Sequence, residues 1–129
     1  MIPGSIILAS VQQSDGQIKK RPALVLAEVP PYKDLLICAI SSKIRHEIAG
    51  FDELIRQSDK DFAQTGLKVD SLIRLGLLAT IPAPSVFGQL GTLSSSCHST
   101  LLARLSDYLR SQIKITPEEQ AFPNNQGEP

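Results

Sequence analysis

Apolar residues divide the chain into a β-rich part and one helical part. Three apolar runs cover residues 5–11, 21–29 and 34–40, and further β-rich stretches cover residues 67–81 and 86–93. These are near-continuous runs rather than alternations, which is typical of strands whose two faces are both covered. We therefore predict a small barrel, or a sheet that packs against a partner.

Turn residues separate the predicted strands. The sequence "SDG" at residues 14–16 favours a tight return between the first two strands. Pro30 and Pro31 end the second strand, because proline cannot donate a ladder hydrogen bond. Gly76 predicts a bulge or bend within the long β-rich stretch. Residues 57–66 are polar, and we expect a loop there.

Two further stretches have a different pattern. Residues 46–56 fit either a helical turn or a twisted strand, and the pattern alone does not decide between them. Helical spacing then predicts an amphipathic helix near residues 95–113, with one of residues 94–96 as its N-cap. The residues at helical spacing are Leu101, Leu102, Leu105, Tyr108, Leu109 and Gln112.

The composition is that of one globular domain. The chain has 129 residues, of which 42% are hydrophobic and 20% are charged. No apolar run approaches the roughly 20 residues of a membrane span, and the N-terminus lacks the pattern of a signal peptide, so we expect a cytoplasmic protein. Cys38 and Cys97 form no CxxC pair; we expect buried free thiols, with no metal and no cofactor.

The net charge of zero hides an acidic tail. The last fourteen residues contain three glutamates and no Lys or Arg, so the rest of the chain has 13 cations against 10 anions. We predict a barrel domain over residues 1–113 and a Pro-containing acidic tail over 114–129, disordered in isolation. The tail either contacts a cationic surface and lowers activity or has no such role.

The candidate chemistry lies where two strands begin and end. Lys19–Arg21 precede the buried second strand, and Ser41–Lys43, followed by Arg45, leave the third. If these strands are antiparallel neighbours, the start of one lies beside the end of the other. Cations and hydroxyls converging there would suit a phosphodiester. The alternative is that these charges only solvate strand ends and deter edge pairing.

Familiar catalytic motifs are missing from the sequence. It contains no phosphate-binding glycine loop, no G-x-S-x-G and no H-E-x-x-H. His46 follows the cationic stretch, and we expect a solvated loop residue, with substrate contact as the alternative. His98 falls in the first turn of the predicted helix, where the helix dipole disfavours an imidazolium, so we expect a surface or capping role.

The order of these motifs resembles the MazF/PemK toxin endoribonucleases of bacterial toxin–antitoxin systems. The similarity covers about residues 4–110. The matching segments are "GSIILASV", "KKRPALVLAEV", "KDLLICAISSK", "TGLKVDSLIRLGLLATI", "GQLGTLS" and "LLARLSDYL".

This resemblance implies a mainly β fold, a small SH3-like antiparallel barrel of the CcdB/MazF type with a C-terminal α-helix. It also implies a homodimer and a cognate antitoxin whose segment covers the RNA groove. The implied activity is metal-independent, sequence-selective cleavage of single-stranded RNA by attack of the ribose 2′-hydroxyl.

The resemblance also implies which residues act. Arg21 of the R-P block and Ser41 at the end of the third strand match the catalytic core of the family. The residues expected to bind substrate are Asp15, Gln17, Lys19, Lys20, Ser42, Lys43 and Arg74.

The sequence departs from the family at three places. Its first loop has no histidine, Gly76 stands where an aspartate would follow Arg74, and Ser5 replaces a common acidic residue. Asp15 is the nearest acidic candidate for a general base, although in "SDG" it also suits a turn. A slow enzyme or an altered cleavage specificity is therefore open. The alternatives are a weak or inactive RNA-binding module, a CcdB-like toxin directed at gyrase, and a purely structural barrel.

Overall fold

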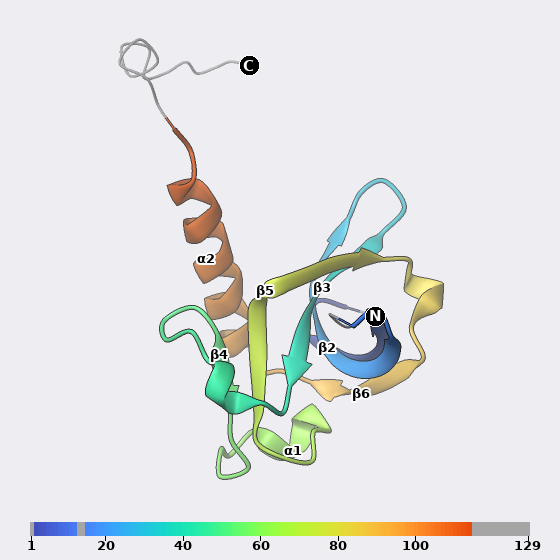
Figure 1. Ribbon diagram of the computed structural model, residues 1–129, viewed down its shortest axis with the longest axis vertical. Coiled ribbons are helices and arrows are strands. Elements are labelled where there is room, and N and C mark those ends of the chain that lie inside the picture. Colours follow the sequence, from blue (N-terminus) through green and yellow to red (C-terminus); the bar gives the residue numbers. More distant parts are fainter. Residues whose placement is uncertain (1, 13–14, 115–129) are drawn as a thin grey trace.

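The chain forms a curled six-stranded antiparallel sheet with one long C-terminal helix (Figure 1). The computed structural model describes residues 2–12 and 15–114, so the predicted tail lies outside the described residues except for Lys114. The sheet order is β4-β5-β3-β2-β1-β6. The strands are β1 (Ser5–Gln12), β2 (Ile18–Val29), β3 (Asp34–Ser41), β4 (Glu53–Ile55), β5 (Ser71–Ile81) and β6 (Gly88–Thr92). The predicted mainly β barrel is thus confirmed as a half-barrel.

The centre of β2 is buried from both sides, as its unbroken apolar run predicts. Ala23–Leu26 have no exposed surface. Leu24 and Leu26 belong to the core beneath the long helix, while Ala23 and Val25 belong to a second core on the opposite face. A strand between two cores cannot slip by one residue without exchanging its two sets of side chains.

The helix α2 (Ser95–Ser111) covers the first of these cores. The Ser94 hydroxyl accepts a hydrogen bond from the Cys97 N–H at 3.3 Å, which confirms the expected N-cap. Leu101 and Leu105 are buried against the sheet. His98 is neither a surface nor a capping residue, because its Nε2 lies 2.9 Å from the Leu26 carbonyl oxygen and links α2 to β2. Within the described residues, no helix is long and apolar enough to cross a bilayer.

The polar stretch expected as a loop contains a short helix, α1 (Phe62–Thr65), so that expectation was wrong. The Thr65 hydroxyl donates to the Phe62 carbonyl at 2.6 Å and accepts from the Leu67 N–H at 3.1 Å. Gly66 ends the helix with φ of 73°, a left-handed conformation that favours glycine. Of the open alternatives for residues 46–56, the strand is correct at β4, and a 3-10 turn, η1 (Ile44–His46), precedes it.

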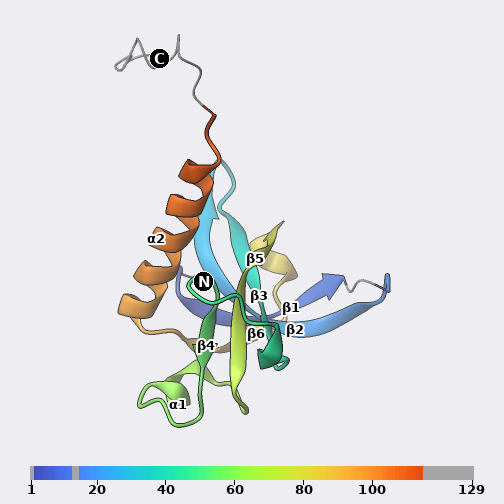
Figure 2. The ribbon, with the colours of Figure 1, turned by 60° about the vertical axis from the view of Figure 1, so that its left-hand side comes forward.

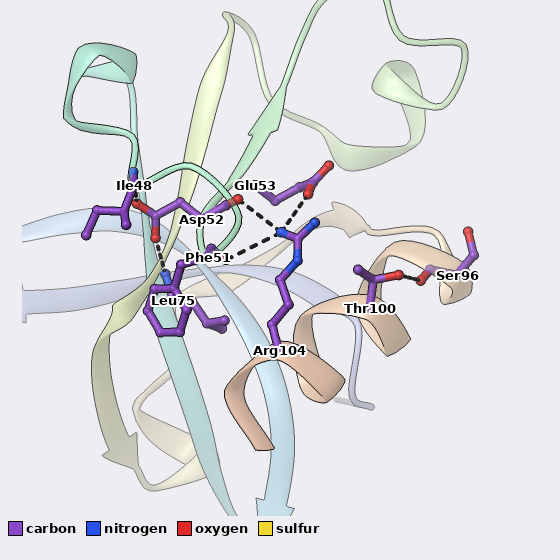
Figure 3. Close-up of polar contacts among 8 residues, drawn as sticks. All are labelled: Ile48, Phe51, Asp52, Glu53, Leu75, Ser96, Thr100 and Arg104. Atoms are coloured by element: carbon purple, nitrogen blue, oxygen red, sulfur yellow. Dashed lines mark hydrogen bonds and ion pairs between the residues drawn. The ribbon is translucent and has the colours of Figure 1, made fainter. Parts of the chain in front are cut away.

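A bulge in β5 is stabilised by one buried carboxylate. Ala39 pairs with Arg74 but Cys38 with Leu78, so three residues of β5 around the predicted Gly76 have no counterpart on β3. Within this bulge the Leu75 N–H donates to Asp52 Oδ1 at 3.0 Å (Figure 3). Asp52 is 4% exposed, and its Oδ2 accepts from the Ile48 N–H at 2.9 Å. Both carboxylate oxygens therefore satisfy backbone donors that lack a ladder partner.

Arg104 ties α2 to the same segment (Figure 3). Its guanidinium donates to the backbone oxygens of Phe51 and Asp52, at 3.4 and 3.0 Å, and to the Glu53 carboxylate at 3.0 Å. Hydrogen bonds from a charged donor are stronger than those between neutral groups. Because Arg104 binds residues 51–53 and Asp52 binds the bulge, α2, β4 and the β5 bulge form one connected unit.

Replacing Asp52 tests this unit. Asp52→Ala leaves two N–H groups without their acceptor, at about 1–3 kcal/mol each, so we expect the free energy of unfolding to fall by about 2–6 kcal/mol. Asp52→Asn keeps one acceptor and should lose about half as much. Urea denaturation measures both values.

The matched control is Asp61→Ala. Asp61 is exposed and its side chain caps nothing, so the change should stay within about 0.5 kcal/mol. Equal losses for the two alanine variants would contradict the role given to Asp52.

Candidate functional site

The first part of β2 extends beyond its ladder with β3. That ladder ends at Ala23, whereas the ladder with β1 continues to Ile18. The β1–β2 ribbon therefore projects from the body of the sheet, away from α2 (Figure 2). Lys19, Lys20 and Arg21 lie on this ribbon, beyond the end of the ladder with β3.

Three candidate residues share one face of the sheet. Ala39 lies directly opposite both Ala23 and Arg74, so these three side chains point to the same side. Side chains two residues apart on a strand point to the same face. Arg21 therefore points to the face of Ala23, and Ser41 to the face of Ala39. Arg21 and Ser41 each lie two residues beyond the Ala23–Ala39 pair, which is the last pair of the ladder, and so stand at the neighbouring ends of β2 and β3. The three come from three neighbouring strands.

Strand alternation divides the cationic cluster. Lys19 lies on the face of Arg21, whereas Lys20 lies on the other face, opposite Ser10. The cations at this strand end are therefore divided between two faces, with Lys19 and Arg21 on one and Lys20 on the other. The Lys20 ammonium instead lies 4.3 Å from the centre of the Phe87 ring.

A cleft of about 280 Å³ opens where the two strand ends meet, and both Arg21 and Ser41 line it. Its walls come from β2, β3, the α1–β5 connection and β6. The remaining lining residues are Pro22, Ile40, Ser42, Gly66, Leu67, Lys68, Val69, Ser71 and Leu90. The lining is mostly apolar and carries cations and hydroxyls, a combination that suits a flat apolar group attached to an anion.

Two glycines fix the far wall of this cleft. A Cβ added to Gly66 would lie 2.0 Å from the Leu90 carbonyl oxygen, and one added to Gly91 would lie 2.2 Å from the Gln64 oxygen. The backbones of α1 and β6 therefore touch, which leaves no room for side chains between them. This contact closes the half-barrel beside the cleft.

The Ser41 hydroxyl is oriented by the turn that follows it. Its oxygen accepts a hydrogen bond from the Lys43 N–H at 3.0 Å. Among the described residues, this hydroxyl donates to no protein acceptor, so its proton is available to a ligand. Ser42 and Lys43 are exposed beside it, and Ser42 also lines the cleft.

Asp15 and Gln17 lie at the tip of the ribbon. Asp15 Oδ1 accepts from the Gln17 N–H at 2.9 Å, which is the turn geometry that "SDG" favours. Both side chains are exposed. Asp15 does not line the cleft.

Part of the cleft could not be predicted from the sequence. Lys68, Val69 and Leu90 line it from segments distant in sequence from the two strand ends. Among the described residues, no group of three or more His, Cys, Asp or Glu side chains is arranged to hold a metal ion.

A second cavity of about 270 Å³ lies on the side of α1 and α2, and Cys97 lines it together with Glu53 and Asp59. Cys38 is fully buried and Cys97 only partly, so the expected burial holds fully for Cys38 alone. Burial raises the pKa of the Cys38 thiol to about 12. Burial and the neighbouring Glu53 carboxylate raise the pKa of Cys97 to about 11. Neither thiol is a ready nucleophile at neutral pH.

The fold is a curled antiparallel half-barrel with a long C-terminal helix, and its cleft lies at the neighbouring ends of two central strands. The family model of PemK-like, MazF-like toxins of type II toxin–antitoxin systems matches residues 2–109, and the chain belongs to this family. The family implies an antitoxin protein as partner.

A solved structure is similar in fold. Mycobacterium tuberculosis toxin MazF-mt6 superposes with a TM-score of 0.59 and 20% sequence identity, over 82% of this chain and 96% of that chain. No curated protein sequence matches the chain.

Thiol reactivity tests the cysteine environments. At pH 8 a thiol with a pKa of about 11 holds about 100-fold less thiolate than one with its ordinary value, so alkylation of Cys97 by iodoacetamide should be slower by that factor in the folded protein. Cys38 should react more slowly still. The rates should rise as the pH approaches these raised values.

The unfolded protein in guanidinium chloride is the control, since both thiols are then exposed. Mass spectrometry identifies which cysteine is modified. Equal rates for Cys97 in folded and unfolded protein at pH 8 would show that its thiolate is not suppressed.

Proposed function

We propose that the protein is a metal-independent endoribonuclease that cleaves single-stranded RNA. The observation that carries the proposal is that Arg21, Ser41 and Arg74 share one face of the sheet, and that Arg21 and Ser41 line one cleft. A guanidinium and a hydroxyl donor side by side match the two non-bridging oxygens of a phosphodiester. Arg74 adds a second cation to the same face.

The reaction needs orientation and charge stabilisation. The ribose 2′-oxygen attacks its own phosphorus, the bond from phosphorus to the 5′-oxygen breaks, and a 2′,3′-cyclic phosphate and a 5′-hydroxyl are formed. Arg21 donates two parallel hydrogen bonds to the non-bridging oxygens, and Ser41 donates a third. Donors aimed at charge that develops in the transition state are each worth about 2.7–4 kcal/mol.

The proton of the 2′-hydroxyl goes to a hydroxide ion of the solvent in this proposal. The described residues that line the cleft include no Asp, Glu or His, and Arg21 stays protonated at neutral pH. A proton from water completes the leaving 5′-hydroxyl. Catalysis then comes from positioning and electrostatics, and the rate should rise with pH instead of passing through a maximum near neutrality.

Substitution of Arg21 and Ser41 tests the proposal. Purified protein is incubated with single-stranded RNA in EDTA, and products are resolved with end analysis for 2′,3′-cyclic phosphate. We expect Arg21→Ala to lower the rate about 10²–10³-fold, and Arg21→Lys not to restore it, because an ammonium cannot make the bidentate contact. Ser41→Ala should cost about 10²-fold or more.

Arg110→Ala is the matched control, because Arg110 is exposed in the last turn of α2 and does not line the cleft. It should cleave at the wild-type rate. RNA binding that depends on Arg21 without any cleavage would assign an RNA-binding module instead. Absence of both binding and cleavage would overturn the proposal.

A second copy of the chain is the further partner that we propose. In β5 the pairing with β4 covers only Ser71–Ile73, so the later half of the strand has an open edge. Leu77 and Leu78 there are 47% and 42% exposed, although they point to opposite faces. Apolar side chains on both faces of an open strand favour association.

Light scattering after gel filtration tests this association. At micromolar concentration we expect a mass about twice 14.0 kDa, and Leu78→Glu should shift it to the monomer, because a carboxylate would be buried in the interface. Tyr32→Glu is the control, at an 84% exposed residue in the β2–β3 turn. A monomeric wild type would exclude the dimer.

A further inference from the structure

An exposed aromatic ring lies outside the cleft, on the connection that precedes β6. Phe87 is 53% exposed, whereas the other phenylalanines of the described residues, Phe51 and Phe62, are partly buried and pack against the core. Exposure of so large an apolar ring to water is unfavourable. The ring does not pack in the hydrophobic core, so it is accessible to a ligand.

The backbone holds this ring in a fixed place. The Phe87 N–H donates to the Leu8 carbonyl at 2.9 Å, next to the first pair of the β1–β6 ladder. The preceding residue, Val86, packs against the second core. Because the Phe87 N–H and the preceding Val86 side chain are both held in place, the phenyl ring should lose little further conformational freedom when a ligand covers it.

A cation accompanies the ring. The Lys20 ammonium lies 4.3 Å from the ring centre, within the range of a cation–π contact. Lys20 is exposed and directly precedes Arg21 in β2, beyond the end of the ladder with β3. Because neighbouring residues of a strand point to opposite faces, an RNA strand that crosses β2 here can meet Arg21 on one face and Lys20 with Phe87 on the other.

We propose that Phe87 and Lys20 form a stacking subsite for a nucleobase of single-stranded RNA, next to the nucleotide at Arg21. The proposal rests on the proposed function, and adds a subsite outside the cleft. In the free protein the Lys20 ammonium lies over this ring; when RNA binds, a base stacks on the ring and the ammonium moves to the adjoining phosphate, whose charge it neutralises. The subsite therefore increases the affinity for RNA but discriminates little between the four bases.

The chain contains no tryptophan, so Phe87→Trp introduces a single fluorophore at the subsite. It is titrated with 2′-O-methyl oligonucleotides, which cannot undergo attack by the 2′-oxygen, and with an abasic strand of equal length. We expect base-containing strands to quench the tryptophan, through stacking, to a saturating value. The abasic strand should leave the emission unchanged.

Binding of a labelled oligonucleotide, followed by anisotropy, gives the affinity. Phe87→Ala should weaken binding by about 5- to 150-fold, the range for loss of one base–aromatic stack. Phe87→Tyr should retain the wild-type affinity, because a tyrosine ring also offers a face for stacking. Lys20→Gln should lower the slope of log affinity against log salt by about 0.7. Tyr32→Ala, which removes a still more exposed ring from the β2–β3 turn, should bind as the wild type does.

The outcomes separate this subsite from the proposed function. If wild type and Phe87→Ala bind and cleave RNA equally, the subsite is wrong and the nuclease stands. Tryptophan emission that responds to the antitoxin but not to bound RNA would assign the surface to a protein and overturn the subsite. A wild type that binds no RNA would overturn both proposals. Circular dichroism and thermal melting verify that each variant is folded.

Discussion

The antiparallel register between β2 and β3 is the constraint on which the candidate site depends. It aligns Ala23 with Ala39 and thereby directs Arg21 and Ser41 to one face. The register is enforced by the two cores on either side of β2, because a slip of one residue would turn Leu24 away from one core and Val25 away from the other. Hydrophobic packing at the middle of the strand thus sets the position of a guanidinium at its end.

The same packing accounts for the cations in front of the most hydrophobic strand. An arginine on a flexible loop would lose conformational entropy each time it bound a phosphate. On a strand anchored by four fully buried residues, Ala23–Leu26, most of that entropy has already been lost on folding. Pro22 adds to the stiffness because it fixes its own φ. The rigid strand makes Arg21 a preorganised donor.

Much of the sheet could be predicted from the sequence, because long apolar runs and turn residues are local signals. The three N-terminal strands, the Gly76 bulge and the Ser94 cap follow from such signals. The short helix α1 could not be predicted, since four residues carry too little periodicity and its stability comes from contacts with β6. For the same reason the contact of His98 with the Leu26 carbonyl has no trace in the sequence.

The candidate site likewise has a part that local sequence signals predict and a part that depends on tertiary contacts. The sequence pattern alone predicts that the two strand ends are close, once β2 and β3 are taken as neighbours. The division of the cations between two faces follows only when the alternation of side chains along a strand is applied to Lys19–Arg21. The cleft wall around Lys68 and Leu90 depends on the glycine contact between α1 and β6, which joins segments about 25 residues apart. An RNA strand on this rim would therefore meet its phosphate ligands on residues set by local sequence. Its bases would instead meet walls set by the tertiary fold, so a change of cleaved motif need not alter Arg21 or Ser41.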